Sequence, residues 1–206
     1  MTFASKLRGF MGNPTTTFGA VKEDTASSAL KYALICLLIL GAAVGLILTL
    51  VLLVHWEIFF FYAQFLGGPP FRGFGSYDEL HHAVRLLPIP ISVGCSIAGG
   101  MIFIFVGGTL THLLVYLLGG RQGHSYRQTL KALAYGATPV CVVGWVPFIG
   151  GVAGGIWAVV VTAIGLRELH GITTGRAVAV AAAGLTLVII VPVIVLLLII
   201  LAPYST

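Results

Sequence analysis

Residues 132–166 read ALAYGATPVCVVGWVPFIGGVAGGIWAVVVTAIGL and contain no Asp, Glu, Lys, Arg or His. Residues 89–108 and 177–206 are also free of these residue types. A charged side chain at the centre of a bilayer costs about 2.5–3.5 kcal/mol on insertion scales, so uncharged stretches of this length indicate a hydrocarbon environment. The sequence therefore predicts an all-α fold, a polytopic bundle of membrane-spanning helices.

The composition supports this fold class and excludes an ordinary water-soluble domain. Of the 206 residues, 58% are hydrophobic and 8% are charged, against about 25% charged in typical soluble domains. The formal net charge is +5, and most basic residues lie between the apolar stretches. We therefore expect the basic rims to contact anionic lipids of the inner leaflet, and we expect no nucleic-acid partner.

The block around residues 132–166 is too long for a single crossing, because a span needs about 20 apolar residues. Pro147 and the glycines at 150–151 break a helix near its midpoint, so we divide it into two spans. Five spans are then predicted, at about 31–54, 90–118, 125–145, 148–169 and 176–201. They form one membrane domain at 30–206 that includes an outer loop at 55–87, and a cytoplasmic amphipathic segment at 1–29 precedes it.

The distribution of Lys and Arg predicts which ends of the spans face the cytoplasm. With a cytoplasmic N-terminus, nine basic residues lie inside, and only Arg72 and Arg85 lie outside. The positive-inside rule therefore places the N-terminus in the cytoplasm and, after five spans, the C-terminus outside. The inside residues are Lys6, Arg8, Lys22, Lys31, Arg121, Arg127, Lys131, Arg167 and Arg176.

The segment before the first span has the pattern of short interfacial helices. Phe3, Leu7 and Phe10 recur at near-helical spacing, and the basic residues Lys6 and Arg8 lie among them. This pattern is typical of a helix that lies at a membrane surface. Asn13–Pro14 is expected to end this helix, and a second short helix is expected to follow.

One pair of residues has the spacing of metal ligands. Asp78 and His82 lie four residues apart in the outer loop, where a helix would place them on one face and zinc could bind. The alternative is a solvated amphipathic helix without metal, since no third ligand is evident. No acid is placed to orient a catalytic base, so we predict no enzyme activity and no cofactor.

His112 lies in the second half of the second predicted span and is a candidate embedded polar site. The alternative is an interfacial histidine that bonds to a neighbouring helix. No predicted span contains an Asp or Glu at depth, which argues against a proton-coupled transporter or a pump.

Several residues are predicted to bend, end or pack the helices. Tyr135–Gly136 with Pro139 indicates a break within the third span, where freed carbonyls would face protein or a water pocket. Gly171 suits the C-terminus of a helix, and glycines at four-residue spacing suit close helix packing. The packing or partner-binding candidates are Tyr135, Gly136, Pro139, Pro147, Gly150, Gly154, Arg167 and His170.

The order of these features resembles the Yip family, the five-span integral membrane proteins that interact with Rab GTPases. The resemblance covers most of the chain and implies the same five-span topology. The elements that carry it are Asn13–Pro14, Phe18 and Val21 near the N-terminus, then Gly119–Gly120, 125–126, 129–130, ALAYGATP at 132–139, VPFIG at 146–150, Trp157, IGLRELHGIT at 164–173 and Ala177.

The resemblance also implies a function and a cellular location. Eukaryotic members bind prenylated small GTPases, help to shape or traffic membranes, and have a long cytoplasmic N-terminal region. Here only about 29 residues precede the first predicted span. The resemblance is therefore to a compact prokaryotic member in the cell membrane, for which small-GTPase binding is not expected.

Two functions from different classes fit the sequence. The first is a membrane scaffold or organiser that binds other membrane proteins, or further copies of itself, through faces of small residues. The second is a small channel or carrier with a site at the broken helices around Gly136–Pro139 and Pro147–Gly151. The scarcity of polar residues within the spans favours the scaffold.

Overall fold

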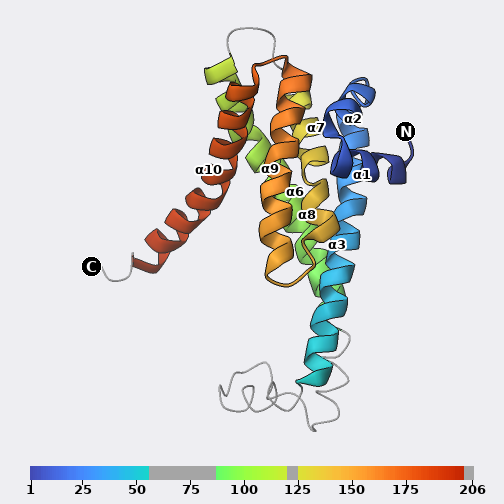
Figure 1. Ribbon diagram of the computed structural model, residues 1–206. Helices are drawn as coiled ribbons and strands as arrows, with labels where there is room; N and C mark the ends of the chain where they lie inside the picture. The colour runs from blue at the N-terminus through green and yellow to red at the C-terminus, as the bar shows by residue number, and fades with distance from the viewer. Residues whose placement is uncertain (56–86, 120–124, 202–206) are drawn as a thin grey trace. The chain divides into compact units, whose positions relative to one another are not determined.

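The computed structural model describes residues 1–55, 87–119 and 125–201, and all regular structure in these residues is helical (Figure 1). The all-α prediction therefore holds for this part of the chain. In chain order the helices are α1 (Phe3–Gly12), α2 (Pro14–Ala20), α3 (Ala26–Val54), α6 (Pro88–Gly119), α7 (Tyr126–Gly136), α8 (Thr138–Val143), α9 (Ile149–His170) and α10 (Thr174–Leu201).

The helix boundaries follow the predicted spans closely, with one difference in kind. Three helices among the described residues are long and apolar enough to cross a membrane: Ala26–Val54, Pro88–Leu118 and Ile149–His170. The third predicted span consists of α7 and α8, with 11 and 6 residues, and a crossing needs about 20. The chain is an integral membrane protein, while the count of five spans and their orientation stay predictions.

The chain divides into two compact units, Met1–Cys36 with Gly99–Thr206, and Leu37–Ala98. In the second unit α3 and α6 approach closely because α3 has glycines where they meet. A Cβ atom on Gly41 would lie 2.6 Å from the Cα of Val93, and the hydroxyl of Ser92 donates to the Gly41 carbonyl over 2.8 Å. Small residues permit such contact between membrane helices.

In the first unit α9 is the central helix, with α2, α7, α8 and α10 packed on it. Two predicted packing glycines lie at these interfaces. A Cβ on Gly136 would lie 3.2 Å from the Cα of Thr162, and one on Gly154 would lie 3.1 Å from the Cα of Val140. Gly151 and Gly155 have no such neighbour, so one face of α9 packs on α7 and α8 while another is open.

The predicted break in the third span is present between α7 and α8. Ala137 separates the two helices, and Thr138 and Pro139 are fully buried. The second predicted break, at Pro147, is also present as the turn before α9. Phe148 in this turn is 96% exposed and has a φ of 63°, a left-handed conformation that is uncommon for a residue with a side chain.

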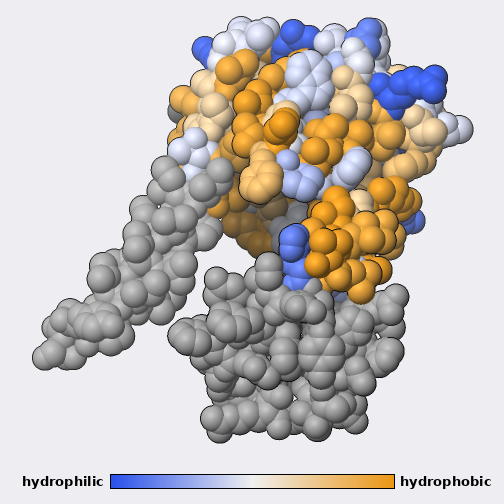
Figure 2. Space-filling view, turned by 60° about the horizontal axis from the view of Figure 1, so that its bottom comes forward, coloured by the Kyte–Doolittle hydropathy of each residue, from blue (hydrophilic) through white to orange (hydrophobic). Residues whose placement is uncertain are grey.

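The surface of the helices is apolar, as contact with lipid requires. Figure 2 shows hydrophobic residues over much of the face in view and hydrophilic residues gathered along one edge. Large apolar side chains such as Ile102, Ile149 and Ile156 are more than 60% exposed. In water such a surface would aggregate, whereas in a bilayer it faces hydrocarbon.

Most of the predicted outer loop, including Asp78 and His82, lies outside the described residues. The metal site proposed for this pair therefore stays a prediction. Among the residues that the structure does describe, no group of three or more His, Cys, Asp and Glu is arranged to hold a metal ion.

Candidate functional site

The helix α1 ends at Asn13–Pro14 as the sequence predicts, and α2 follows and packs on it. The hydroxyl of Thr2 accepts a hydrogen bond from the N–H of Ser5 and so caps the start of α1. The Asn13 side chain caps the start of α2, whose first residue is Pro14. Proline is favoured at this position because its missing N–H has no partner in the first turn of a helix. The result is a helical hairpin before α3.

An aromatic cluster joins this hairpin to the membrane helices. Phe10 stacks on Tyr135 of α7 with 4.8 Å between ring centroids, and it meets Phe18 edge-on at 4.9 Å. Tyr32 of α3 lies 5.3 Å from Tyr135. Phe10, Phe18 and Tyr135 are completely buried, and Phe18 packs against Gly165 of α9. The phenylalanines of the predicted interfacial segment thus contact protein.

Charged side chains surround this cluster in a network that we call the amino-terminal latch, made of Lys6, Asp24, Lys131 and Tyr135. The ammonium of Lys6 lies 2.5 Å from Oδ2 of Asp24 and donates to the Tyr135 hydroxyl over 3.2 Å. That hydroxyl donates to the same Asp24 oxygen over 2.6 Å. Lys131 donates to the backbone carbonyls of Lys22, at 2.7 Å, and Asp24, at 3.0 Å.

The latch gives hydrogen-bond partners to charged side chains that would be costly to bury without them. Lys6 is 7% exposed and Lys131 is 4% exposed. Burial of Asp24 opposes its ionisation, but hydrogen bonds from Lys6 and Tyr135 outweigh this effect, so the pKa of the Asp24 carboxyl lies below its usual value of 3.8. The carboxylate is therefore charged at neutral pH and ties α1 to α7.

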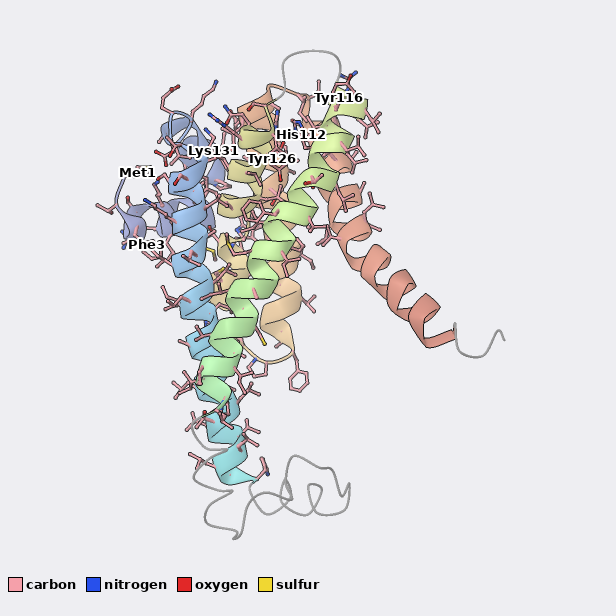
Figure 3. The ribbon with its side chains drawn as sticks, turned by 180° about the vertical axis from the view of Figure 1, so that it is seen from behind. Met1, Phe3, His112, Tyr116, Tyr126 and Lys131 are labelled. Atoms are coloured by element: carbon pink, nitrogen blue, oxygen red, sulfur yellow. The ribbon has the colours of Figure 1, made fainter. Side chains whose placement is uncertain are left out.

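A second polar cluster, which we call the histidine bridge, consists of His112 of α6, Thr129 of α7 and His170 of α9. The hydroxyl of Thr129 lies 3.0 Å from Nδ1 of His112 and 3.0 Å from Nε2 of His170. Thr129 is completely buried. Tyr126 stands edge-on to His112 with ring centroids 5.5 Å apart, and Figure 3 labels both residues. The bridge joins three helices.

The end of α9 confirms the predicted stop. Gly171 has a φ of 66°, the left-handed conformation that glycine adopts freely, and its N–H donates to the carbonyl of Arg167 over 2.8 Å. The Arg167 side chain pairs with Glu168 at 2.6 Å. Among the described residues, Arg167 and His170 are the basic side chains in this last turn, where they favour the negative end of the helix.

The predicted candidates in the described residues have different roles in the structure. Tyr135 belongs to the latch, and His112 and His170 meet in the bridge. Pro147 is exposed in the turn before α9, and Arg167 pairs with its neighbour. The remaining candidates pack helices or form the break between them, and they are Gly136, Pro139, Gly150 and Gly154.

The sequence pattern does not identify the other members of these clusters. It places Lys6 on an interfacial helix and Lys131 at the rim of a span. The available signal was the position of Lys131, since it is followed at once by the uncharged run from Ala132. A lysine so close to hydrocarbon needs a partner, and the structure supplies one in the backbone carbonyls of Lys22 and Asp24.

The comparisons with known proteins agree with the resemblance noted in the sequence. The family model of the Yip1 domain matches residues 8–198. No curated protein and no solved structure matches the chain.

Proposed function

The chain belongs to the Yip1 domain family, and from this premise we propose that it is a non-enzymatic membrane scaffold or organiser that binds partner membrane proteins. The observation that carries the proposal is the amino-terminal latch. Its charges are engaged in holding α1 and the segment between α2 and α3 against α7. A surface built from preformed helices loses little conformational entropy on binding, which suits a docking platform.

The charges at this end of the molecule support contact with an anionic leaflet. Each exposed Lys or Arg near an anionic membrane surface adds about 1 kcal/mol of attraction. We propose that this end faces the cytoplasm of a prokaryotic cell, as the positive-inside rule predicts. Among the described residues of the first unit, the exposed basic side chains are Arg8, Lys22, Lys31, Arg127 and Arg176.

The open face of α9 supports association within the bilayer. Gly151 and Gly155 have no neighbours near the position of a Cβ atom, and Val152 and Ile156 beside them are each 65% exposed. Small residues allow the backbone of another helix to approach. This face fits a second copy of the chain or another membrane protein.

No observation favours the alternative of a channel or carrier. The break at Gly136–Pro139 is filled by protein, because Thr138 and Pro139 are fully buried and Gly136 packs on Thr162. At the second break, Gly150 and Gly154 pack on α8. The freed backbone groups that would line a transport site are thus enclosed by neighbouring helices.

Cross-linking and pull-down from native membranes, with lipid retained, test the scaffold proposal. We expect the wild-type chain to capture oligomers or a protein partner, and we expect Asp24→Asn to lose most of this capture. Glu23→Gln is the matched control, because Glu23 is the adjacent exposed acid and the same charge is removed. Recovery of monomers alone, without any partner, contradicts the proposal. Solute flux into liposomes would instead support the channel.

A further inference from the structure

Two of the three cysteines in the chain lie in the protein interior. Cys36 of α3 is 2% exposed and Cys141 of α8 is 4% exposed, whereas Cys95 of α6 is exposed. Cys36 and Cys141 both belong to the first unit, and neither is a member of the latch or of the histidine bridge. Because a thiol can be oxidised and can form a bond with a second thiol, a buried pair is a candidate site in its own right.

The packing of α3 on α8 places these two thiols together. The hydroxyl groups of Tyr32 in α3 and Thr138 in α8 lie 3.1 Å apart. In α3 Cys36 lies four residues after that tyrosine, and in α8 Cys141 lies three residues after that threonine. Side chains at these spacings share one face of a helix, so both thiols lie one turn beyond the joined hydroxyl groups. The thiols of Cys36 and Cys141 form a hydrogen bond with each other.

The surroundings of the pair restrict its chemistry. In the part of the chain that the structure describes, the two thiols belong to no group of three or more His, Cys, Asp and Glu that could hold a metal ion, whereas structural zinc takes four ligands. Tyr32 is 5% exposed and Thr138 is completely buried, so the site is closed to bulky or charged thiol compounds. Two sulfurs that meet on different helices need only a small oxidant to form a bond with each other.

We propose that Cys36 and Cys141 are an oxidation site at which hydrogen peroxide, a small and uncharged oxidant, forms a disulfide bond between α3 and α8. The sulfur of one thiol attacks a peroxide oxygen, the O–O bond breaks, and a sulfenic acid and one water molecule form. The sulfur of the second thiol then attacks the first sulfur and the S–O bond breaks. The released hydroxide takes the proton of the second thiol and leaves as water. Two electrons thus pass from the sulfurs to the peroxide.

The contact between the two thiols determines how each cysteine ends. A sulfenic acid at Cys36 or Cys141 meets its partner thiol and becomes a disulfide, which a thiol reductant can reverse once the chain is unfolded. Cys95 is then left without a cysteine partner in the chain, so its oxidation continues to a sulfinic acid. This inference is independent of the scaffold function, because it concerns the chemistry of thiols within one chain and not the identity of a partner.

Oxidation of the full chain in washed native membranes tests the site, with hydrogen peroxide and, in a parallel sample, with diamide. Diamide is an uncharged diazene that takes up the same two electrons and two protons. After denaturation in a maleimide and digestion, mass spectrometry should find peptides linked through Cys36 and Cys141, and a thiol reductant should separate them. Maleimide labelling of these two cysteines should fall at least about tenfold on oxidation. Full labelling of both cysteines after either oxidant, or a bond from one of them to Cys95, overturns the proposal.

Cysteine variants and a denatured sample separate this pair from unspecific oxidation. Cys95→Ser removes the exposed thiol and is the matched control, so the linked peptides should form as in the wild type. Cys36→Ala and Cys141→Ala should each leave the other thiol available to maleimide after diamide. Wild-type chain that is denatured before oxidation should also give bonds to Cys95, because only the fold selects the pair. The same mixture of pairings in folded and denatured chains contradicts the site.

Discussion

The latch and the histidine bridge solve the same problem in different ways. Both fasten helices through buried polar groups, but the latch does so with opposite charges and the bridge with hydrogen bonds through a shared hydroxyl. Burial opposes the ionisation of Asp24, but hydrogen bonds from Lys6 and Tyr135 lower the pKa of its carboxyl, so the latch keeps its charge at neutral pH. The difference teaches that an ion pair fastens the amino-terminal helices, whereas one buried hydroxyl joins α6, α7 and α9.

The largest effect is expected from removal of the aromatic base of the latch. Phe10→Ala deletes a completely buried ring and should lower the free energy of unfolding by about 3–5 kcal/mol, because a cavity is added to the lost burial. Phe148→Ala is the matched control, since its ring is 96% exposed. Thermal or denaturant unfolding in detergent measures both variants. Equal losses at the two positions would break the distinction between the aromatic cluster and the lipid-facing surface.

A somewhat smaller effect is expected from removal of the charge in the latch. Asp24→Asn leaves the buried ammonium of Lys6 without a carboxylate and should cost about 2–3 kcal/mol. Limited proteolysis should then cut between α1 and α3 sooner than in the wild type, while the ends of α6 and α9 keep their protection. The exposed change Glu23→Gln should leave the cutting rate unchanged. Loss of protection at the histidine bridge as well would show that the two clusters are one cooperative unit.

The close packing of α7 on α9 positions both clusters, and a substitution at Gly136 tests this packing. Gly136→Ala would press a Cβ atom against Thr162 of α9, and relief of this overlap should cost about 1–3 kcal/mol. Gly151→Ala is the control on the open face of α9 and should be neutral or slightly stabilising. Unfolding in detergent compares the two. A neutral Gly136→Ala variant would contradict the close contact between α7 and α9.

The latch should resist mild acidification, and this is the smallest of the expected effects. Because the pKa of Asp24 is lower in the folded state, its stabilising contribution is present above 3.8 and is lost as the pH falls through the lower value. The slope cannot exceed about 1.4 kcal/mol per pH unit for one group. Protease resistance of the hairpin should therefore stay constant from about pH 8 to about pH 5 and decline only below the usual value of 3.8. A loss of resistance already at mildly acidic pH would contradict the charged state of Asp24 in the latch.

The helices of this chain could be predicted because local residue types determine them. The apolar runs marked α3, α6, α9 and α10 to within about five residues, and Pro139 with Gly136 marked the break between α7 and α8. Gly171 marked the end of α9. Each of these features depends on the hydrophobicity or backbone preference of adjacent residues, so the sequence alone was sufficient.

The partners across the bundle could not be predicted in the same way. Lys6 and Tyr135 are 129 residues apart, and Thr129 and His170 are 41 residues apart. Hydropathy alone assigns Lys6 to a membrane surface and cannot show that it meets an acid inside the protein. His112 was recognised as an embedded polar residue, but its link to His170 depends on the packing of three helices.

The most direct test of the central claim, that α1 is fixed inside the membrane domain by the latch, is the reactivity of the lysines in intact membranes. The chain has four lysines, of which Lys6 and Lys131 are buried while Lys22 and Lys31 are exposed. With a small membrane-permeant amine reagent and mass spectrometry, we predict fast modification of Lys22 and Lys31 and protection of Lys6 and Lys131. Modification of Lys6 at the rate of Lys22 would contradict the account.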